Sequence, residues 1–154
     1  MPIAESAEVV QDWPQPGTGN NGPLLRYGHG PTMLAYDTPD EKVAVVTVPG
    51  CLQVVCGHPN DEVLNGHPLY GKGLAFYSVH RVRNSARLAA MERANSVHHR
   101  HDAATYLKNK EHWIFTFQDG TVEFLALSSG TSAMSFKLCS SWAEANALLA
   151  AGEA

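Results

Sequence analysis

The sequence predicts an α+β fold: a single domain in which a curved, mostly antiparallel sheet carries helices packed on one side. Three observations lead to this prediction. Short valine- and aromatic-rich runs alternate with turn residues, an Asp-Gly pair separates two of these runs, and the tail after residue 140 is rich in alanine and leucine. A length of 154 residues suits one domain, and 44% apolar residues can fill its core.

The first thirty residues differ in composition from the rest. Prolines and glycines gather between residues 14 and 23, as is typical of turns rather than of regular elements. We therefore predict a Pro/Gly-rich N-terminal arm over residues 1–30 and one α+β domain over residues 31–154. The arm could wrap the domain, reach a second copy and so support a homo-oligomer, or form a partly disordered leader.

The predicted strands begin with residues 32–36. Two valine-rich runs follow at residues 42–48 and 51–56, and the Pro-Gly pair between them suits a turn, which predicts an antiparallel hairpin. A polar loop then occupies residues 57–73, and residues 74–82 alternate as a further strand should.

Helix start signals place three helices. Asn84 or Ser85 can cap a helix that follows directly, and a short helix is expected at residues 103–109. Ser140 or Ser141 can cap a last helix that runs to residue 151, where Glu144 stands at capping-box distance from Ser141.

The best-defined element is a hairpin of residues 111–118 and 121–128 around Asp119-Gly120. A two-residue loop would pair Gln118 with Thr121, so that alternate residues share a face. The predicted core face then holds Trp113, Phe115, Phe117, Val122, Phe124 and Ala126.

The opposite face of this hairpin carries a carboxylate among apolar neighbours. Glu123 would be flanked by Ile114 and Leu125, which is unusual for a freely solvated surface. We expect Glu123 to point into a half-buried pocket, where desolvation would raise its pKa. The alternative is an outward charge on a mixed face.

Composition excludes several classes of partner. A net charge of −4 without a dense basic patch argues against nucleic acid, and no apolar run approaches the ~18 residues that span a membrane. Residues 1–12 lack the features of a signal peptide. Three cysteines without metal-ligand spacing fit a reduced, cytoplasmic protein.

The loop at residues 57–68 is the densest group of polar side chains and the predicted site. His58 is the candidate general acid or base, and His67 is a second one. Alternatively, these side chains only cap backbone groups or form an Asx-turn. The candidate catalytic residues are His58, Asn60, Asp61, Glu62, His67 and Glu123. Asp61 or Glu62 would orient His58, and Asn60 would hold a developing oxyanion.

Three further side chains could contact a substrate: Tyr70, Tyr77 and His112. The phenols offer hydrogen bonds, although tyrosine at the margin of a core is ordinary. The sequence contains no dinucleotide-binding fingerprint, so hydride transfer on such a fold is not expected.

A second histidine group could hold a metal. On a continuing helix, His98, His101 and Asp102 share a face, and imidazole with carboxylate suits zinc or iron. Their spacing matches neither HExxH nor the zinc-finger patterns. The alternative is a solvated helix end, where histidines meet the negative pole of the dipole.

These residues together predict a small cytoplasmic enzyme that performs acid/base chemistry on a small polar metabolite. It would be a lyase, an isomerase or a hydrolase, and it would use no organic cofactor. A His-ligated metalloprotein and a non-catalytic binding or assembly module are the two alternatives.

Overall fold

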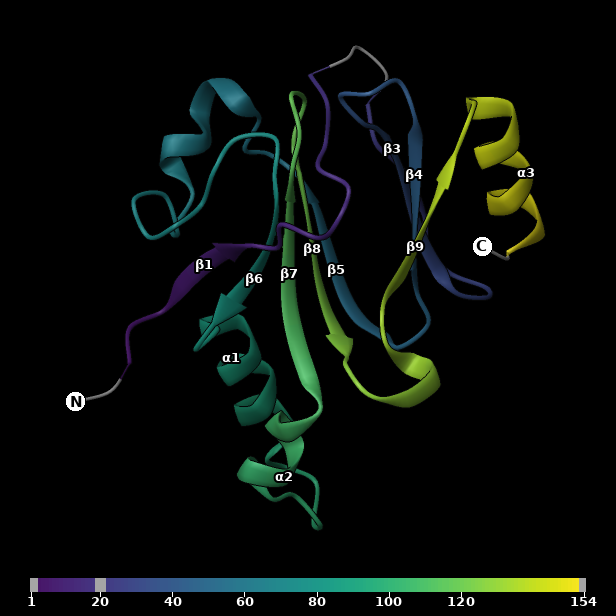
Figure 1. The fold of residues 1–154 in the computed structure, drawn as a ribbon. Coiled ribbons are helices and arrows are strands. Elements are labelled where there is room, and N and C mark those ends of the chain that lie inside the picture. The colour runs from purple at the N-terminus through teal and green to yellow at the C-terminus, as the bar shows by residue number, and fades with distance from the viewer. Residues whose placement is uncertain (1–2, 19–21, 153–154) are drawn as a thin grey trace.

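The structure is a computed structural model that describes residues 3–18 and 22–152. Two antiparallel sheets face each other in it, with helices outside them, which confirms the α+β prediction (Figure 1). One sheet has the strand order β1-β6-β7-β8-β5 and the other β2-β3-β4-β9. The strands are β1 (Ser6–Val9), β2 (Leu24–Arg26), β3 (Thr32–Asp37), β4 (Val43–Val48), β5 (Cys51–Gly57), β6 (Val79–Arg83), β7 (Lys110–Thr116), β8 (Thr121–Leu127) and β9 (Ser135–Cys139). The helices are α1 (Ala86–Asn95), α2 (Ala103–Lys108) and α3 (Trp142–Ala151), with short 3₁₀ helices η1 (Asp61–Gly66) and η2 (Gly130–Ser132).

The main core lies between the two sheets. Tyr36 on β3 meets the ring of Phe115 on β7 edge-on, with 5.8 Å between the ring centroids. Phe115 in turn packs against Phe124 of β8. Every aromatic side chain that the sequence assigns to the core face of the hairpin lies in this cluster, so that assignment is confirmed.

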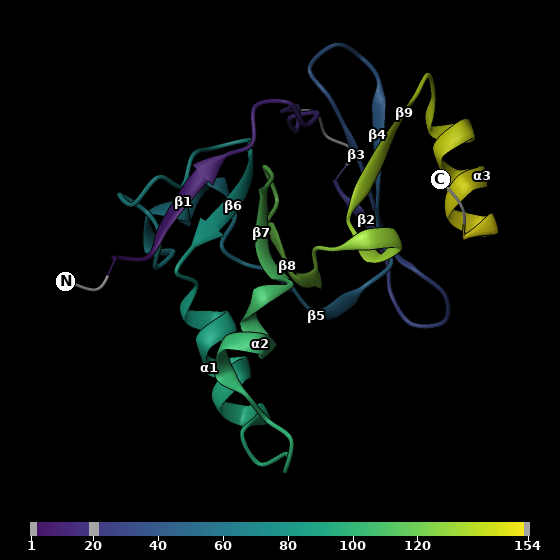
Figure 2. The same cartoon turned by 60° about the horizontal axis from the view of Figure 1, so that its bottom comes forward.

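Because there are two sheets, there are two outer faces to cover, and the helices divide between them. Helix α3 lies beside the four-stranded sheet (Figure 2), and its Ala145 and Leu149 pack onto Met33 and Val45 of that sheet. Helix α1 lies against β7 of the five-stranded sheet, and α2 packs beside α1. None of the helices within the described residues is long and apolar enough to cross a membrane.

The predicted hairpin of residues 42–48 and 51–56 is wrong. β4 pairs with β3 and β9, whereas β5 pairs with β8 in the other sheet. The Pro49-Gly50 turn therefore carries the chain from one sheet to the other. A Cβ on Gly50 would lie only 2.7 Å from Cβ of Leu127, so the turn packs directly against β8.

Two strand details also differ from the prediction. β6 begins at Val79 rather than at residue 74. The hairpin of β7 and β8 is confirmed, but its register is shifted by two residues, with Thr116 opposite Thr121. A backbone hydrogen bond from Phe117 to the carbonyl of Gly120 places these two residues opposite each other, so the turn lies at Gln118 and Asp119. A shift of two residues keeps every side chain on its predicted face.

The predicted helix caps are confirmed. The Ser85 hydroxyl accepts the backbone N–H of Leu88 at the start of α1. Ser141 caps α3 by accepting the N–H of Glu144, and the Glu144 carboxylate accepts the N–H of Ser140 in return.

The N-terminal arm contributes a strand to each sheet. β1 pairs with β6, and β2 pairs with β3. Between these strands, the carbonyl of Pro14 accepts the hydroxyl of Tyr36 at 2.7 Å, and the Gln15 amide oxygen accepts the N–H of Val79 at 2.8 Å. The described part of the arm therefore packs against the rest of its own chain through strand pairing and these hydrogen bonds.

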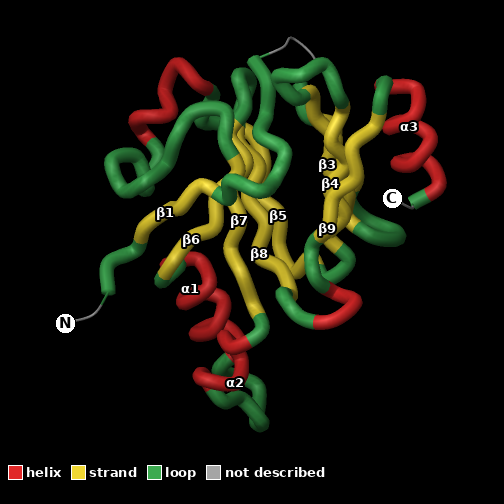
Figure 3. Tube along the Cα trace, viewed as in Figure 1, coloured by secondary structure: helices red, strands yellow, loops and turns green. Residues whose placement is uncertain are grey.

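The segment between β5 and β6 folds back over the outer face of the five-stranded sheet (Figure 3). Its leucines Leu64, Leu69 and Leu74 pack on Ile114 of β7 and on β1. The carbonyl of Lys72 accepts the N–H of Ala7 at 2.8 Å, which fixes the segment to the sheet edge.

Two glycines in this segment give a matched test of that attachment. Gly71 and Gly73 both have positive φ, but a Cβ on Gly73 would lie 1.9 Å from the carbonyl oxygen of Ala7, whereas Gly71 faces open space. We expect Gly71→Ala to cost about 1 kcal/mol through its backbone conformation alone, and Gly73→Ala to cost about 3 kcal/mol or more. Urea unfolding of both variants measures the difference, and equal losses would contradict the close approach to β1.

Candidate functional site

A buried carboxylate lies on the outer face of the five-stranded sheet, on the strand next to the edge strand β5. Glu123 on β8 is paired with Ile114 of β7 and Val55 of β5, and only 5% of it is exposed. Four separate parts of the chain surround it: β7, β8, the segment after β5, and the first turn of α1.

Two imidazoles hold the two carboxylate oxygens of Glu123. Nε2 of His67 lies 2.9 Å from Oε2, and Nε2 of His112 lies 2.7 Å from Oε1. Nε of Arg87 approaches Oε1 at 3.4 Å, and its side chain is 45% exposed. The arrangement therefore joins one buried anion to two buried imidazoles and to one cation that reaches the surface.

The partners of the two Nδ1 atoms show which group donates the proton in each of these hydrogen bonds. The backbone N–H of Leu69 donates to Nδ1 of His67 at 3.0 Å, so Nε2 carries the proton that His67 donates to Glu123. The Ser85 hydroxyl lies 2.7 Å from Nδ1 of His112. Because its oxygen already accepts the N–H of Leu88, its proton is free to point at His112.

A continuous chain of hydrogen bonds results. It runs from the start of α1 through Ser85 and His112 to Glu123, and a second branch runs from Leu69 through His67 to the same carboxylate. Every polar atom in it has a partner, which is the condition under which a buried polar network is stable.

These contacts reverse the expected pKa shift of Glu123. Burial raises the pKa, but the hydrogen bonds from His112 and His67 outweigh it and lower the pKa from 4.5 to about 2. The prediction of a raised pKa is therefore wrong, because two imidazoles from distant parts of the chain donate to this carboxylate and outweigh its desolvation. Glu123 is an anion at neutral pH.

The structure brings together three of the residues that the sequence singles out: His67, His112 and Glu123. His58 and Glu62 are exposed on the same segment. The predicted residues that lie apart from the carboxylate have other surroundings. Asp61 accepts the hydroxyl of Tyr77 at 2.6 Å, Oδ1 of Asn60 is buried without a hydrogen-bond partner among the described residues, and Tyr70 is 46% exposed.

Sequence reasoning missed three residues of this region. The sequence predicts Ser85 only as a helix cap, and it marks Arg87 only as one of several arginines in a small, interrupted basic patch. His80 is fully buried on β6; its Nε2 accepts the N–H of Ala75, and its Nδ1 donates to the carbonyl of Ile114. Burial lowers the pKa of His80, so it is a neutral structural side chain that holds the segment before β6.

The second histidine group lies at the far end of α1. The Asp102 carboxylate caps α2 through the backbone and hydroxyl of Thr105, and the ring of His98 stacks on that of His99. In the part of the chain that the structure describes, no group of three or more His, Cys, Asp or Glu side chains is arranged to hold a metal ion.

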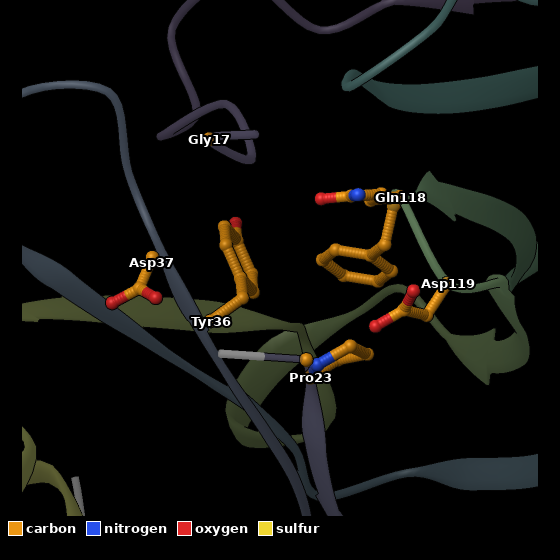
Figure 4. Close-up of a pocket in the computed structure, with 8 residues that line it drawn as sticks. Gly17, Pro23, Tyr36, Asp37, Gln118 and Asp119 are labelled. Carbon is orange, nitrogen blue, oxygen red and sulfur yellow. The ribbon is translucent and has the colours of Figure 1, made fainter. Parts of the chain in front are cut away.

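Two surface hollows bear on substrate access. A groove of about 350 Å³ adjoins Arg87, with walls from α1 and β5. Another recess, bordered by Tyr36 and Gln118, measures only about 10 Å³ (Figure 4), which is room for about one water. The groove beside Arg87 is therefore the better place for a small molecule. Its lining residues are Gln53, Arg87, Ala90, Met91 and Ala94.

Comparison with known proteins identifies no relative: no protein-family model, no curated protein and no solved structure matches the chain. The chemistry of the site is accordingly argued from its geometry.

The depressed pKa of Glu123 predicts a specific acid sensitivity. A carboxylate whose pKa is lower in the folded state stabilises the protein above its unfolded pKa, and that contribution is lost as the pH falls from about 4.5 to about 2. We expect the difference in unfolding free energy between the wild type and Glu123→Gln to shrink over this window by up to about 3 kcal/mol. Urea unfolding at a series of pH values measures it, and parallel curves would contradict the pairing.

The two histidine-proline steps of the segment provide a matched pair. His67→Ala removes a buried donor to Glu123 and should lower the free energy of unfolding by about 3 kcal/mol. His58→Ala changes an exposed side chain and should stay within about 0.5 kcal/mol of the wild type. Thermal and urea unfolding of both variants test this order, and the reverse order would show that His67 does not anchor the segment.

Proposed function

We propose that this chain is a small enzyme that performs acid–base chemistry on a small anionic metabolite at the Glu123 site. One observation carries the proposal: an ionised, buried carboxylate holds two imidazoles by Nε2, and one of them is linked to a serine hydroxyl. Titratable side chains with shifted pKa values are concentrated at catalytic sites, and histidine is the side chain that most often transfers protons there.

The role of Glu123 would be to orient the rings and to stabilise positive charge on them. When Nδ1 of His112 takes a proton from a hydroxyl or from a substrate, the imidazolium lies 2.7 Å from the carboxylate that offsets its charge. Ser85, at 2.7 Å from Nδ1, is the group through which that proton would pass. His67 holds the other carboxylate oxygen and keeps Glu123 in place.

Arg87 suggests the charge of the substrate. Its Nε is engaged with Glu123, while nearly half of its side chain is exposed in the groove between α1 and β5. A guanidinium in that position can bind a carboxylate or phosphate group. Ala90, Met91 and Ala94 form an apolar wall that suits a short carbon chain.

The hydrogen bonds favour His112 as the proton-transferring group, because its Nδ1 faces a hydroxyl, whereas His67 uses both ring nitrogens to bind Leu69 and Glu123. His58 is exposed and is not part of this network. The reaction types open to such a site are elimination, isomerisation and hydrolysis, which need only protein side chains as proton donors and acceptors. A cytoplasmic location belongs to the proposal as well, because the cysteines at positions 51, 56 and 139 are all unpaired.

Proton exchange offers a direct test that does not require the substrate to be known. We would incubate the protein in D₂O with pooled small hydroxy, keto and amino acids and their methyl esters, and follow proton NMR spectra. We expect the wild type to exchange a C–H proton of one compound or to consume it. Glu123→Gln and His112→Gln should slow this by about 100-fold or more, because each breaks the relay.

His58→Ala is the matched control and should keep full activity. Circular dichroism of each variant confirms that it is folded before its rate is compared. Activity that survives Glu123→Gln and His112→Gln would overturn the assignment of the site. No exchange or turnover of any compound would leave the network with a stabilising role only and would end the proposal.

A further inference from the structure

A groove lies beside the edge strand β9 of the four-stranded sheet, and the Glu123 network uses none of its residues. It measures about 260 Å³. The N-terminal arm, the turn between β3 and β4, and β9 itself contribute its walls. Its lining includes Asp12, Trp13, Pro14, Asp40, Phe136 and Leu138.

Strand β9 has one edge without a neighbouring strand. It pairs with β4 on one side only, because it is the last strand of its sheet. Among the described residues, no backbone-to-backbone hydrogen bond joins residues 135–139 to anything but β4. Every second residue of an edge strand turns its N–H and C=O outward, so a further extended chain can pair with β9.

Two apolar side chains of β9 line the groove at this free edge. Phe136 is 40% exposed and Leu138 is 46% exposed. They are paired with Val46 and Ala44 of β4, which belong to the core between the sheets, so all four side chains share the inner face. A strand added to β9 would place every second side chain on that face, beside Phe136 and Leu138.

The wall that faces these side chains is held in place by its own contacts. The ring of Trp13 packs on Phe136 at 4.9 Å between ring centroids and on Trp113 of the main core at 4.7 Å. The side-chain amide of Gln15 donates to the carbonyl of Trp13 at 2.7 Å. A preformed apolar recess loses little conformational freedom when a side chain enters it.

The charged side chains that line the groove are all acidic. Asp12 and Asp40 line it, together with no lysine, arginine or histidine. Neither carboxylate forms an ion pair with another residue of the described chain. The whole chain also carries a net charge of −4. Charge complementarity therefore favours a basic occupant.

A second copy of this chain fits the free edge less well. Antiparallel pairing of two β9 strands about their middle residue would set Lys137 directly opposite the same lysine of the other copy. Like charges directly opposite each other destabilise a strand pair. The occupant that meets both the charge and the strand geometry is a segment of a different protein.

We propose that β9 and the adjoining groove bind an extended basic peptide, which adds to the four-stranded sheet as a fifth strand. Its backbone pairs with the free edge of β9, and alternate apolar side chains lie beside Phe136 and Leu138. A lysine or arginine of the peptide lies near Asp12 and Asp40. This binding site goes beyond the proposed enzymatic function and shares no residue with the Glu123 network.

The test is fluorescence polarisation with two labelled seven-residue peptides, RVTLTVR and EVTLTVE. They share three alternating apolar residues and differ only in charge. Each sequence reads the same in both directions, so it can pair in either orientation. We expect saturable binding of the arginine peptide to the wild type, and binding of the glutamate peptide that is weaker by about tenfold or more.

Variants with matched controls locate the binding. Leu138→Ala should weaken binding of the arginine peptide about fivefold or more, as should Asp40→Asn, which keeps an acceptor for the Thr38 hydroxyl. Leu52→Ala changes a leucine of similar exposure on the edge strand β5, and Glu41→Gln changes an exposed carboxylate outside the groove lining. Both controls should keep the wild-type affinity.

Amide NMR of the wild type distinguishes strand addition from binding in the groove alone, and it does not depend on a variant. We expect the amides of residues 135–139 to shift and to exchange more slowly with the arginine peptide bound. Failure of that peptide to bind, equal binding of the two peptides, or amide changes confined to other strands would each overturn the proposal. So would a dimer whose β9 amides are protected without peptide, because a second copy would then occupy the edge.

Discussion

The need to pair one buried charge constrains this structure more than any other interaction. An ionised carboxylate away from water is stable only when its oxygens are hydrogen-bonded to suitable donors. Glu123 obtains them from His67 and His112, and the guanidinium of Arg87 adds a positive charge 3.4 Å from Oε1. These three residues come from three different parts of the chain. The segment after β5, strand β7 and the first turn of α1 must all be in place at once for this charge to be tolerated.

The apolar packing of the same region supports that requirement. Leu64, Leu69 and Leu74 fix the segment after β5 over Ile114, so His67 reaches the sheet on a scaffold that is itself buried. Ser85 has two roles, since its hydroxyl caps the start of α1 and also forms a hydrogen bond with Nδ1 of His112. Fold and site therefore share the same residues, and mutations here need readouts that separate stability from activity.

The sequence predicts those features whose signals are local. The caps at Ser85 and Ser141 and the faces of the β7–β8 hairpin depend on a few neighbouring residues, and the structure confirms them. The crossing at Pro49-Gly50 could not be predicted, because a corner between sheets and a hairpin have the same turn residues. The low pKa of Glu123 and the involvement of Arg87 depend on contacts between distant segments, which periodicity does not encode.

The two hydrogen bonds of the Ser85 hydroxyl affect how easily His112 can change its protonation state. An oxygen with two lone pairs can accept the N–H of Leu88 and still accept a second hydrogen bond, from Nδ1 of His112. If the adjacent ring became an imidazolium, the hydroxyl hydrogen would swing aside while all heavy atoms stayed where they are. Neutral and cationic forms of His112 thus fit one and the same framework, so a change in its protonation requires little rearrangement of the surrounding protein.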